Sequence, residues 1–381
     1  MSARTGEMER GARRRAILCA LAMAIGVGAA TSGCGTKFEL PDQTPQQVTP
    51  GEDTYFVKFR WGGFTGARDV LMTRGGQIFI AEPRPDTTDS LRVRIYQRSK
   101  VEPTPTGVEL PSLGRPIRIA EGDRGAIFVL DDVAPASVKQ FTADGRFLVG
   151  SFSDPAWTEI VADTSRVGGS TERVTSSEIV MRGLAADREN SVYVAWTDST
   201  FYLDRDLLDT TRVDTTRTTV VSHRIVKYTA DGIPLETLAS EGSGAGFVDG
   251  PGGLEATIDG LLYADVNKDW VQLVDTDEPS TPLLLLNGLN VPDDPQFDVP
   301  LDVAGDDSGS IYVADSAKRR VLRFDRDGVF DKRVDLAADG VTGLAVDPIA
   351  LTANTELVYI LDAALGEVLV FELRSELEDT Q

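Results

Sequence analysis

Residues Leu301–Phe330 read LDVAGDDSGSIYVADSAKRRVLRFDRDGVF. Three short apolar segments alternate here with turns: LDVA, then IYVAD, then RVLRFD. An Asp-Gly pair at Asp327-Gly328 follows the third segment, and this pair favours the two-residue turn of a β-hairpin because both positions take positive φ. The stretch therefore predicts an antiparallel meander in which a fourth strand follows the Asp-Gly turn.

The same pattern recurs along the chain. The IYVAD-like segment is found six times, at 78–82, 127–131, 192–196, 261–265, 311–315 and 358–362. The third segment follows each copy, at 92–97, 137–142, 224–229, 270–275, 320–325 and 367–372. The first segment precedes each copy, at 69–72, 117–120, 183–186, 253–256, 301–304 and 343–346. Six copies in step predict an all-β chain, folded as a six-bladed β-propeller of four-stranded antiparallel blades.

The ends of the repeat region predict how the ring closes. The last copy stops after its third strand, EVLVFE at 367–372, and a short tail at 375–381 follows. Residues 54–61 (TYFVKFRW) form an apolar strand that precedes the first copy and has no blade of its own. Pairing this N-terminal strand with the last blade would complete that blade and remove two free sheet edges. We therefore expect the propeller to span residues 54–374.

The repeat resembles the NHL family, in which an apolar strand is followed by a G-x-I-Y-V-A-D strand and then by an R-V-x-x-F strand. The resemblance covers residues 54–374 and is closest at Leu301–Phe330. It implies a six-bladed propeller. It implies little about function, because NHL propellers include enzymes, binding modules and scaffolds.

The N-terminal 33 residues have the features of a targeting segment rather than of a folded domain. Four arginines between Arg10 and Arg15 precede a short apolar stretch at 16–30, and Ser32-Gly33-Cys34 resembles a lipobox. This pattern predicts a lipoprotein signal peptide, lipidation at Cys34 and a Pro- and Gln-rich flexible tether at 34–53, with ordinary cleavage near Ala30 as the alternative. We expect an outer-membrane lipoprotein in the cell envelope, periplasmic or surface-exposed, held in the membrane by that lipid.

The net charge and the single histidine exclude some classes of function. The net charge of −22 argues against nucleic-acid binding, because phosphate backbones would be repelled. His223 is the only histidine, so a multi-histidine metal centre is ruled out. No cofactor is expected, and a calcium site built from carboxylate and Asn oxygens stays open. The six-bladed sugar lactonases use such a site, with an inner-strand Glu and Asn ligands, and a resemblance to them would imply Glu255 with Asn190 or Asn267.

Two long spacings interrupt the repeat. The IYVAD-like segments begin at 78, 127, 192, 261, 311 and 358, so successive gaps are 49, 65, 69, 50 and 47 residues. The excess lies in two insertions, at 152–179 and 197–222, which a meander places on the same rim beside blade three. The second has the loose alternation of an extended hairpin. The insertions are either tolerated surface loops or a recognition surface on a rigid scaffold.

Candidate ligand-binding residues lie where the inner strands begin, at the channel mouth. They are two carboxylates, several arginines and one aromatic residue: Asp69, Asp302, Arg68, Arg115, Arg118, Arg182 and Trp196. Arginines at such a mouth could grip a carboxylate or phosphate, or could pair with the neighbouring acids instead. Trp196 is singled out because it replaces the acid that ends the IYVAD-like strand in the other blades, at Glu82, Asp131, Asp265, Asp315 and Asp362. Those acids are expected to accept backbone hydrogen bonds from the turn that follows each of them.

Together these observations predict a lipid-anchored, non-catalytic binding or scaffold protein that recognises a protein, peptide or glycan through the face carrying the insertions. The alternative is a divalent-metal-dependent lactonase or esterase of the propeller type.

Overall fold

A computed structural model describes residues 53–85, 90–97, 104–160, 163–168, 171–206, 217–279, 281–292, 294–334 and 348–375. The predicted signal peptide, Cys34, nearly all of the tether and the C-terminal tail lie outside the described residues. In the described part of the chain, no helix is long and apolar enough to cross a bilayer.

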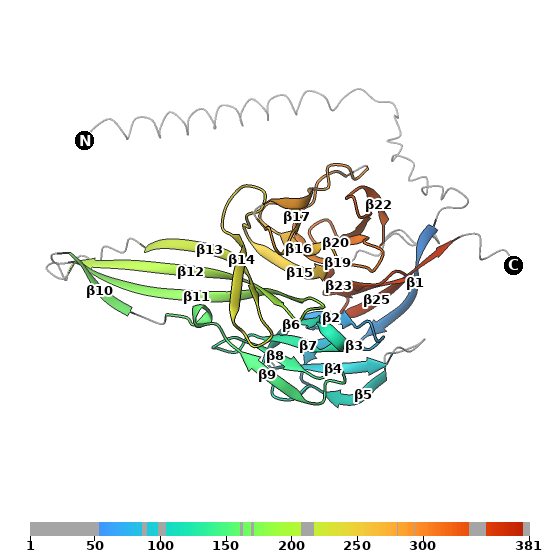
Figure 1. Ribbon diagram of the computed structural model, residues 1–381, viewed down its shortest axis with the longest axis horizontal. Coiled ribbons are helices and arrows are strands. Elements are labelled where there is room, and N and C mark those ends of the chain that lie inside the picture. The colour runs from blue at the N-terminus through green and yellow to red at the C-terminus, as the bar shows by residue number, and fades with distance from the viewer. Residues whose placement is uncertain are drawn as a thin grey trace, which may run out of the picture. The chain divides into compact units, whose positions relative to one another are not determined.

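Six antiparallel sheets form the blades of a propeller (Figure 1). Blade one contains β2 (Asp69–Met72), β3 (Ile78–Pro83), β4 (Leu91–Gln97) and β5 (Thr104–Glu109). Blade two contains β6 (Pro116–Glu121), β7 (Ile127–Asp131), β8 (Ser137–Phe141) and β9 (Leu148–Phe152). Blade three contains β10 (Asp163–Gly168), β11 (Thr171–Ala186), β12 (Val192–Asp206), β13 (Arg217–Tyr228) and β14 (Pro234–Ser240).

The second half of the ring follows the same plan. Blade four contains β15 (Pro251–Thr257), β16 (Gly260–Asp265), β17 (Trp270–Val274) and β18 (Pro282–Leu286). Blade five contains β19 (Pro300–Gly305), β20 (Ile311–Asp315), β21 (Arg320–Phe324) and β22 (Phe330–Arg333). Blade six contains β23 (Pro348–Ala353), β24 (Leu357–Asp362), β25 (Glu367–Ser375) and β1 (Asp53–Gly62). The predicted six-bladed fold is confirmed, with a fifth strand, β10, added to blade three.

The ring closes as the sequence predicts. Each inner strand contacts the inner strand of the next blade, and β23 of blade six returns to β2 of blade one. The closing strand β1 pairs with β25 from Asp53↔Ser375 to Gly62↔Glu367, with one irregularity between Val57 and Phe59. β1, the first strand that the structure describes, therefore forms the outer edge of the last blade.

The core lies between adjacent blades. In β20, Ile311 and Val313 pack with residues of blade four, whereas Tyr312 and Ala314 pack with residues of blade six. Successive side chains of a strand point to opposite faces of its sheet, and both faces of a blade are covered by its neighbours. This is why IYVA is a continuous apolar run rather than an alternating one.

Blade six corrects one predicted strand. The inner strand was expected at 343–346, which lies outside the described residues, and β23 at 348–353 forms it instead. β23 begins with Pro348 opposite Asp362, just as β19 begins with Pro300 opposite Asp315. The expected segment starts 15 residues before the IYVAD-like strand, against 8 to 10 residues in the other blades, so the spacing already contradicted it.

The two insertions build one structure, which we call the arm: residues 163–168, 171–181, 197–206 and 217–223. Part of the first insertion forms β10 and the beginning of β11, and the second extends β12 and β13. The extended strands pair from Thr171↔Asp206 on one side and from Leu203↔Arg217 on the other. The arm projects from blade three as a long sheet (Figure 1). The expected hairpin is therefore present, and the first insertion joins it as two further strands.

Candidate functional site

Three of the predicted channel-mouth residues hold neighbouring blades together. The amide of Ile119 in blade two donates to Asp69 Oδ2 at 2.6 Å, and the amide of Leu351 in blade six donates to Asp302 Oδ2 at 2.8 Å. Arg118 Nε donates to the carbonyl of Arg182 in blade three at 3.0 Å, and its Nη1 lies 3.6 Å from Asp69 Oδ1. These side chains are engaged with the ring itself, mostly through backbone groups, and the expected pairing among them is seen only for Arg118 with Asp69.

Burial dominates the electrostatics of this group. It raises the pKa of Asp69 to about 7, an effect that Arg118 opposes and Asp302 reinforces. It also raises the pKa of Asp302, against the opposing charge of Arg118. Glu255, on the inner strand of blade four, has its pKa raised to about 8 by burial and then by the charges of Asp302, Glu121 and Asp69. Several acids thus share the channel with one buried arginine, which favours protonation of some of them near neutral pH.

The other predicted residues have different surroundings. Arg68, Arg115 and Arg182 are exposed, and Arg115 lies 3.6 Å from Asp132. Trp196 was expected at the channel mouth, and this placement is wrong: its side chain is 3% exposed and packs between blades two and three. Its ring centroid lies 5.9 Å from that of Trp157, a residue of the first insertion.

The recurrent acids behave as structural residues. Asp131 accepts the amides of Gly114 and Arg115, Asp265 accepts the amide of Asp249, and Asp315 accepts the amide of Asp298. In these three blades the amides belong to the loop before the inner strand rather than to the turn after the acid. Asp362 instead accepts the amide of Leu365, in the turn that follows. Glu82 accepts from the side chains of Arg92 and Tyr96.

His223 lies at the root of the arm. Its Nδ1 is 3.0 Å from Thr197 Oγ1, and its Nε2 is 3.5 Å from Asp249 Oδ1 in the loop before blade four. Burial lowers the pKa of His223, against the charges of Asp249 and Glu241. His223 and Thr197 are both buried, and the contact of His223 with Asp249 links the arm to the loop before blade four.

The candidate calcium ligands do not form a common set. Asn190 Oδ1 accepts the amide of Asp123, and Asn267 Nδ2 donates to Asp249 Oδ1. Across the residues that the structure describes, no three His, Cys, Asp or Glu side chains are grouped so as to hold a metal ion. No such group includes Glu255 in the described chain.

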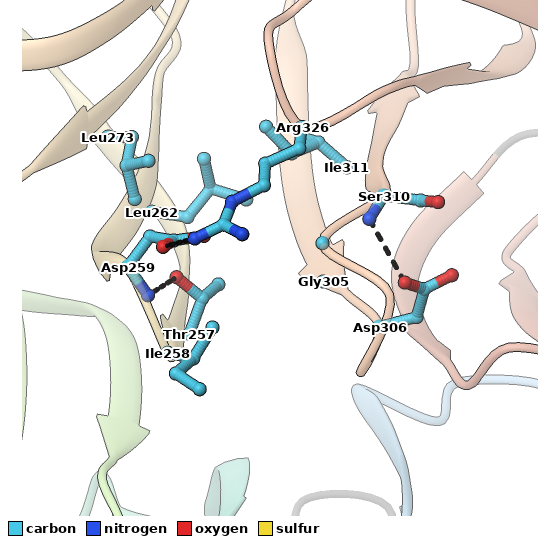
Figure 2. Close-up of a pocket in the computed structure, with 11 residues that line it drawn as sticks. Thr257, Ile258, Asp259, Leu262, Leu273, Gly305, Asp306, Ser310, Ile311 and Arg326 are labelled. Carbon is cyan, nitrogen blue, oxygen red and sulfur yellow. Dashed lines mark hydrogen bonds and ion pairs between the residues drawn. The ribbon is translucent and has the colours of Figure 1, made fainter.

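A pocket between blades four and five is too small for an organic ligand. Figure 2 shows it, lined by Leu262, Leu273 and Ile311 and crossed by Arg326, which pairs with Asp259. Its volume is about 20 Å³, which holds about one water molecule.

The arm offers the larger surface, and its two faces differ. Ala195 and Ile225 pack against blade four, so Leu203 on β12 and Val221 on β13 lie on that same face by strand alternation. Val174 opposes Leu203 and Val180 opposes Thr197, which adds two apolar residues of β11. We call this the blade-four face of the arm. Sequence reasoning missed these residues, although the alternation in TFYLD at 200–204 signalled them.

The opposite face of the arm is more polar. Arg173 stacks over the ring of Tyr202 at 5.2 Å, and Asp198, Thr200 and Val220 belong to the same side. The arm is thus an amphipathic sheet that leaves the ring, with its apolar side toward blade four.

Comparison with known proteins finds structural similarity at low sequence identity and no match in sequence. No family model matches the sequence, and no curated protein matches it. Virginiamycin B lyase from Staphylococcus aureus is similar in structure, with 9% identity, a TM-score of 0.48 and alignment over 85% of this chain and 100% of that chain. The aldose sugar dehydrogenase of Streptomyces coelicolor aligns with 11% identity and a TM-score of 0.49, over 86% of this chain and 100% of that chain. A Bacteroides thetaiotaomicron protein of unknown function aligns with 13% identity and a TM-score of 0.48, over 85% of this chain and 72% of that chain.

Proposed function

We propose that this chain is a non-catalytic recognition protein of the cell envelope, with NHL-like blades as scaffold and the arm of blade three as its binding surface. The observation that supports this function most is that two insertions, separated by the β11–β12 repeat segment, join in a single amphipathic sheet. On the blade-four face Val221 is exposed, and Val174, Val180 and Leu203 are partly buried. The partner is a protein, peptide or glycan, and the apolar blade-four face favours a polypeptide.

The channel supports binding less well. Asp69, Arg118 and Asp302 make hydrogen bonds to the backbone of neighbouring blades, so a ligand would have to displace contacts that hold the ring. The backbone pairing of the arm lies within its own strands, and its contact with blade four is at its root, between His223 and Asp249.

Shortening the arm tests the proposal. Ser199 opposes Val221 across β12 and β13, so replacing residues 200–220 by Asp-Gly joins opposed residues through a favoured hairpin turn. We expect the propeller to keep its thermal transition and to lose the partner captured by the full chain from envelope extracts. Phe147→Lys, an exposed change on the turn after β8, serves as the matched control and should retain the partner. A shortened protein that captures the same partners with the same yield would refute the recognition role.

The anchor is tested separately. In the proposal Cys34 carries the lipid, and the basic stretch and short apolar segment before it support this. Intact-mass analysis of the membrane fraction should show an acylated chain that begins at Cys34. An unacylated chain beginning near Ala30 would contradict the anchor and leave the role of the arm open to its own test.

A further inference from the structure

Among the residues that the structure describes, one edge of the arm has no strand beside it. β13 pairs with β12 along Arg217–Tyr228, but β14 pairs with β13 only between Arg224 and Tyr228. Among the described residues, positions 217–223 therefore have a strand on one side only. The outward N–H and C=O groups of such a segment are a template for a further strand.

The amino-acid composition of this edge is unusual among the outer strands of the chain. Residues 218–222 read TTVVS, which contains no charge, no proline and no glycine in a protein with 26% charged residues. Val220 is 50% exposed and Val221 is 38% exposed. Other outer strands carry features that hinder pairing: β22 contains Asp331, Lys332 and Arg333, and β5 contains Pro105. β-Branched residues on an unprotected edge favour strand addition.

We propose that this edge pairs antiparallel with the same edge of a second copy of the chain, with a two-fold axis at Val220. The free segment runs from 217 to 223, so its midpoint is Val220. In this register Val220 opposes Val220 of the second copy, Thr219 opposes Val221, and Thr218 opposes Ser222. No charged residue opposes a like charge, and the pair forms the self-complementary interface that a two-fold dimer requires.

Electrostatic repulsion between two copies is weaker for pairing at Val220 than for contact between the two acidic propellers. Residues 197–223 contain five Asp and three Arg, a net charge of −2 of the −22 of the whole chain. Val220 lies four residues beyond Arg224, roughly 13 Å along the strand. Pairing at Val220 therefore holds the two acidic propellers apart by more than a Debye length of about 8 Å, where their repulsion is screened.

This inference is independent of the partner under the proposed function, because it uses the edge of β13 rather than the blade-four face. The experiment measures self-association of the full chain in detergent by sedimentation velocity. We expect a dimer for the unmodified chain and at least about a tenfold weaker association for Val220→Lys, since each new lysine opposes its own copy. Val220→Glu should be weakened in the same way. An equimolar mixture of the two variants should recover a dimer.

The register has its own control. Val221→Lys places each lysine opposite Thr219, so it should weaken association less than Val220→Lys. Thermal unfolding of each variant checks that the exposed substitutions leave the fold intact. A monomeric unmodified chain, a mixture that fails to recover the dimer, or a Val221→Lys effect as large as that of Val220→Lys would each overturn the proposal.

Discussion

Blade five and blade three differ in the residue that stands at the end of the IYVAD-like strand and in what that residue contacts. In blade five, β20 ends at Asp315, which accepts the amide of Asp298 at 2.8 Å and pairs with Arg320 Nε at 2.7 Å. In blade three, the corresponding position is Trp196, which packs against Trp157, and β12 continues for ten more residues to Asp206. The acid holds a short loop against the end of a strand. Where the strand continues into the arm, no such loop remains to be held, and the position becomes part of the core.

Restoring the repeat consensus in blade three should be the most damaging change. Trp196→Asp removes the ring that packs on Trp157 and Met181 and buries a carboxylate among apolar side chains. We expect a loss of more than about 4 kcal/mol in the free energy of unfolding, because truncation of a buried aromatic and burial of an unpaired charge act together. Trp196→Phe should cost about 1–2 kcal/mol. Urea titration of both variants measures the difference, and a well-folded Trp196→Asp protein would break the comparison.

The converse change in blade five should cost less. Asp315→Ala removes the buried partner of Arg320, which is itself 1% exposed. Breaking a buried ion pair by removing one partner costs about 3 kcal/mol. Arg320 keeps hydrogen bonds to the carbonyls of Asp294 and Gln296, which limits the loss. If calorimetry shows that Asp315→Ala lowers the free energy of unfolding by less than about 1 kcal/mol, the acid does not hold the loop.

The last prediction concerns the stability effect of two acids on inner strands, Asp302 and Glu255. Asp302 of blade five accepts a backbone amide, whereas Glu255 of blade four has its pKa raised from 4.5 to about 8. An acid whose pKa is raised on folding destabilises the protein as pH rises between those two values, because the unfolded chain loses its proton first. Glu255→Gln should therefore stabilise the protein at pH 8, and the gain in the free energy of unfolding should grow as the pH rises from 4.5 to 8.

At the acid end of that window, near pH 4.5, the same substitution should have no effect. Glu236→Gln, an exposed glutamate on β14, is the matched control and should change nothing at either pH. Melting curves at both pH values decide the point. Equal stabilisation by Glu255→Gln across the range would show that titration of this group is not the cause.

Most of the fold follows from the sequence because each blade repeats one solution. Both faces of a blade are covered by its neighbours, so the apolar runs are long and recur with the same spacing. The one misplaced strand is the segment 343–346: its residues are apolar as in the other inner strands, but its spacing to the IYVAD-like strand differs from theirs. A proline would have located it: Pro116, Pro251, Pro300 and Pro348 each begin an inner strand opposite the last acid of the second strand. Proline suits that position, where the strand starts.

The site was harder to predict than the fold. Asp69, Arg118 and Asp302 were placed correctly at the inner strands, but the repeat cannot show that backbone amides and carbonyls of the next blade already occupy them. Trp196 was misplaced because a departure from the repeat was read as a ligand contact, when the departure reflects packing against the insertion residue Trp157. Contacts between a repeat and an insertion have no periodicity, so spacing carries no information about them.

The pairing of β1 with β25 makes the ring depend on both ends of the chain. Lys58 of the first strand contacts Glu372 of the last across 314 positions, so the closed loop contains all the intervening blades. The entropic cost of closing so long a loop grows only with the logarithm of its length. During synthesis, however, β1 is made first and stays unpaired until residue 367 and those after it have emerged. A chain interrupted before residue 367 lacks the strand that pairs with β1, so the ring can close only after all six blades have been made.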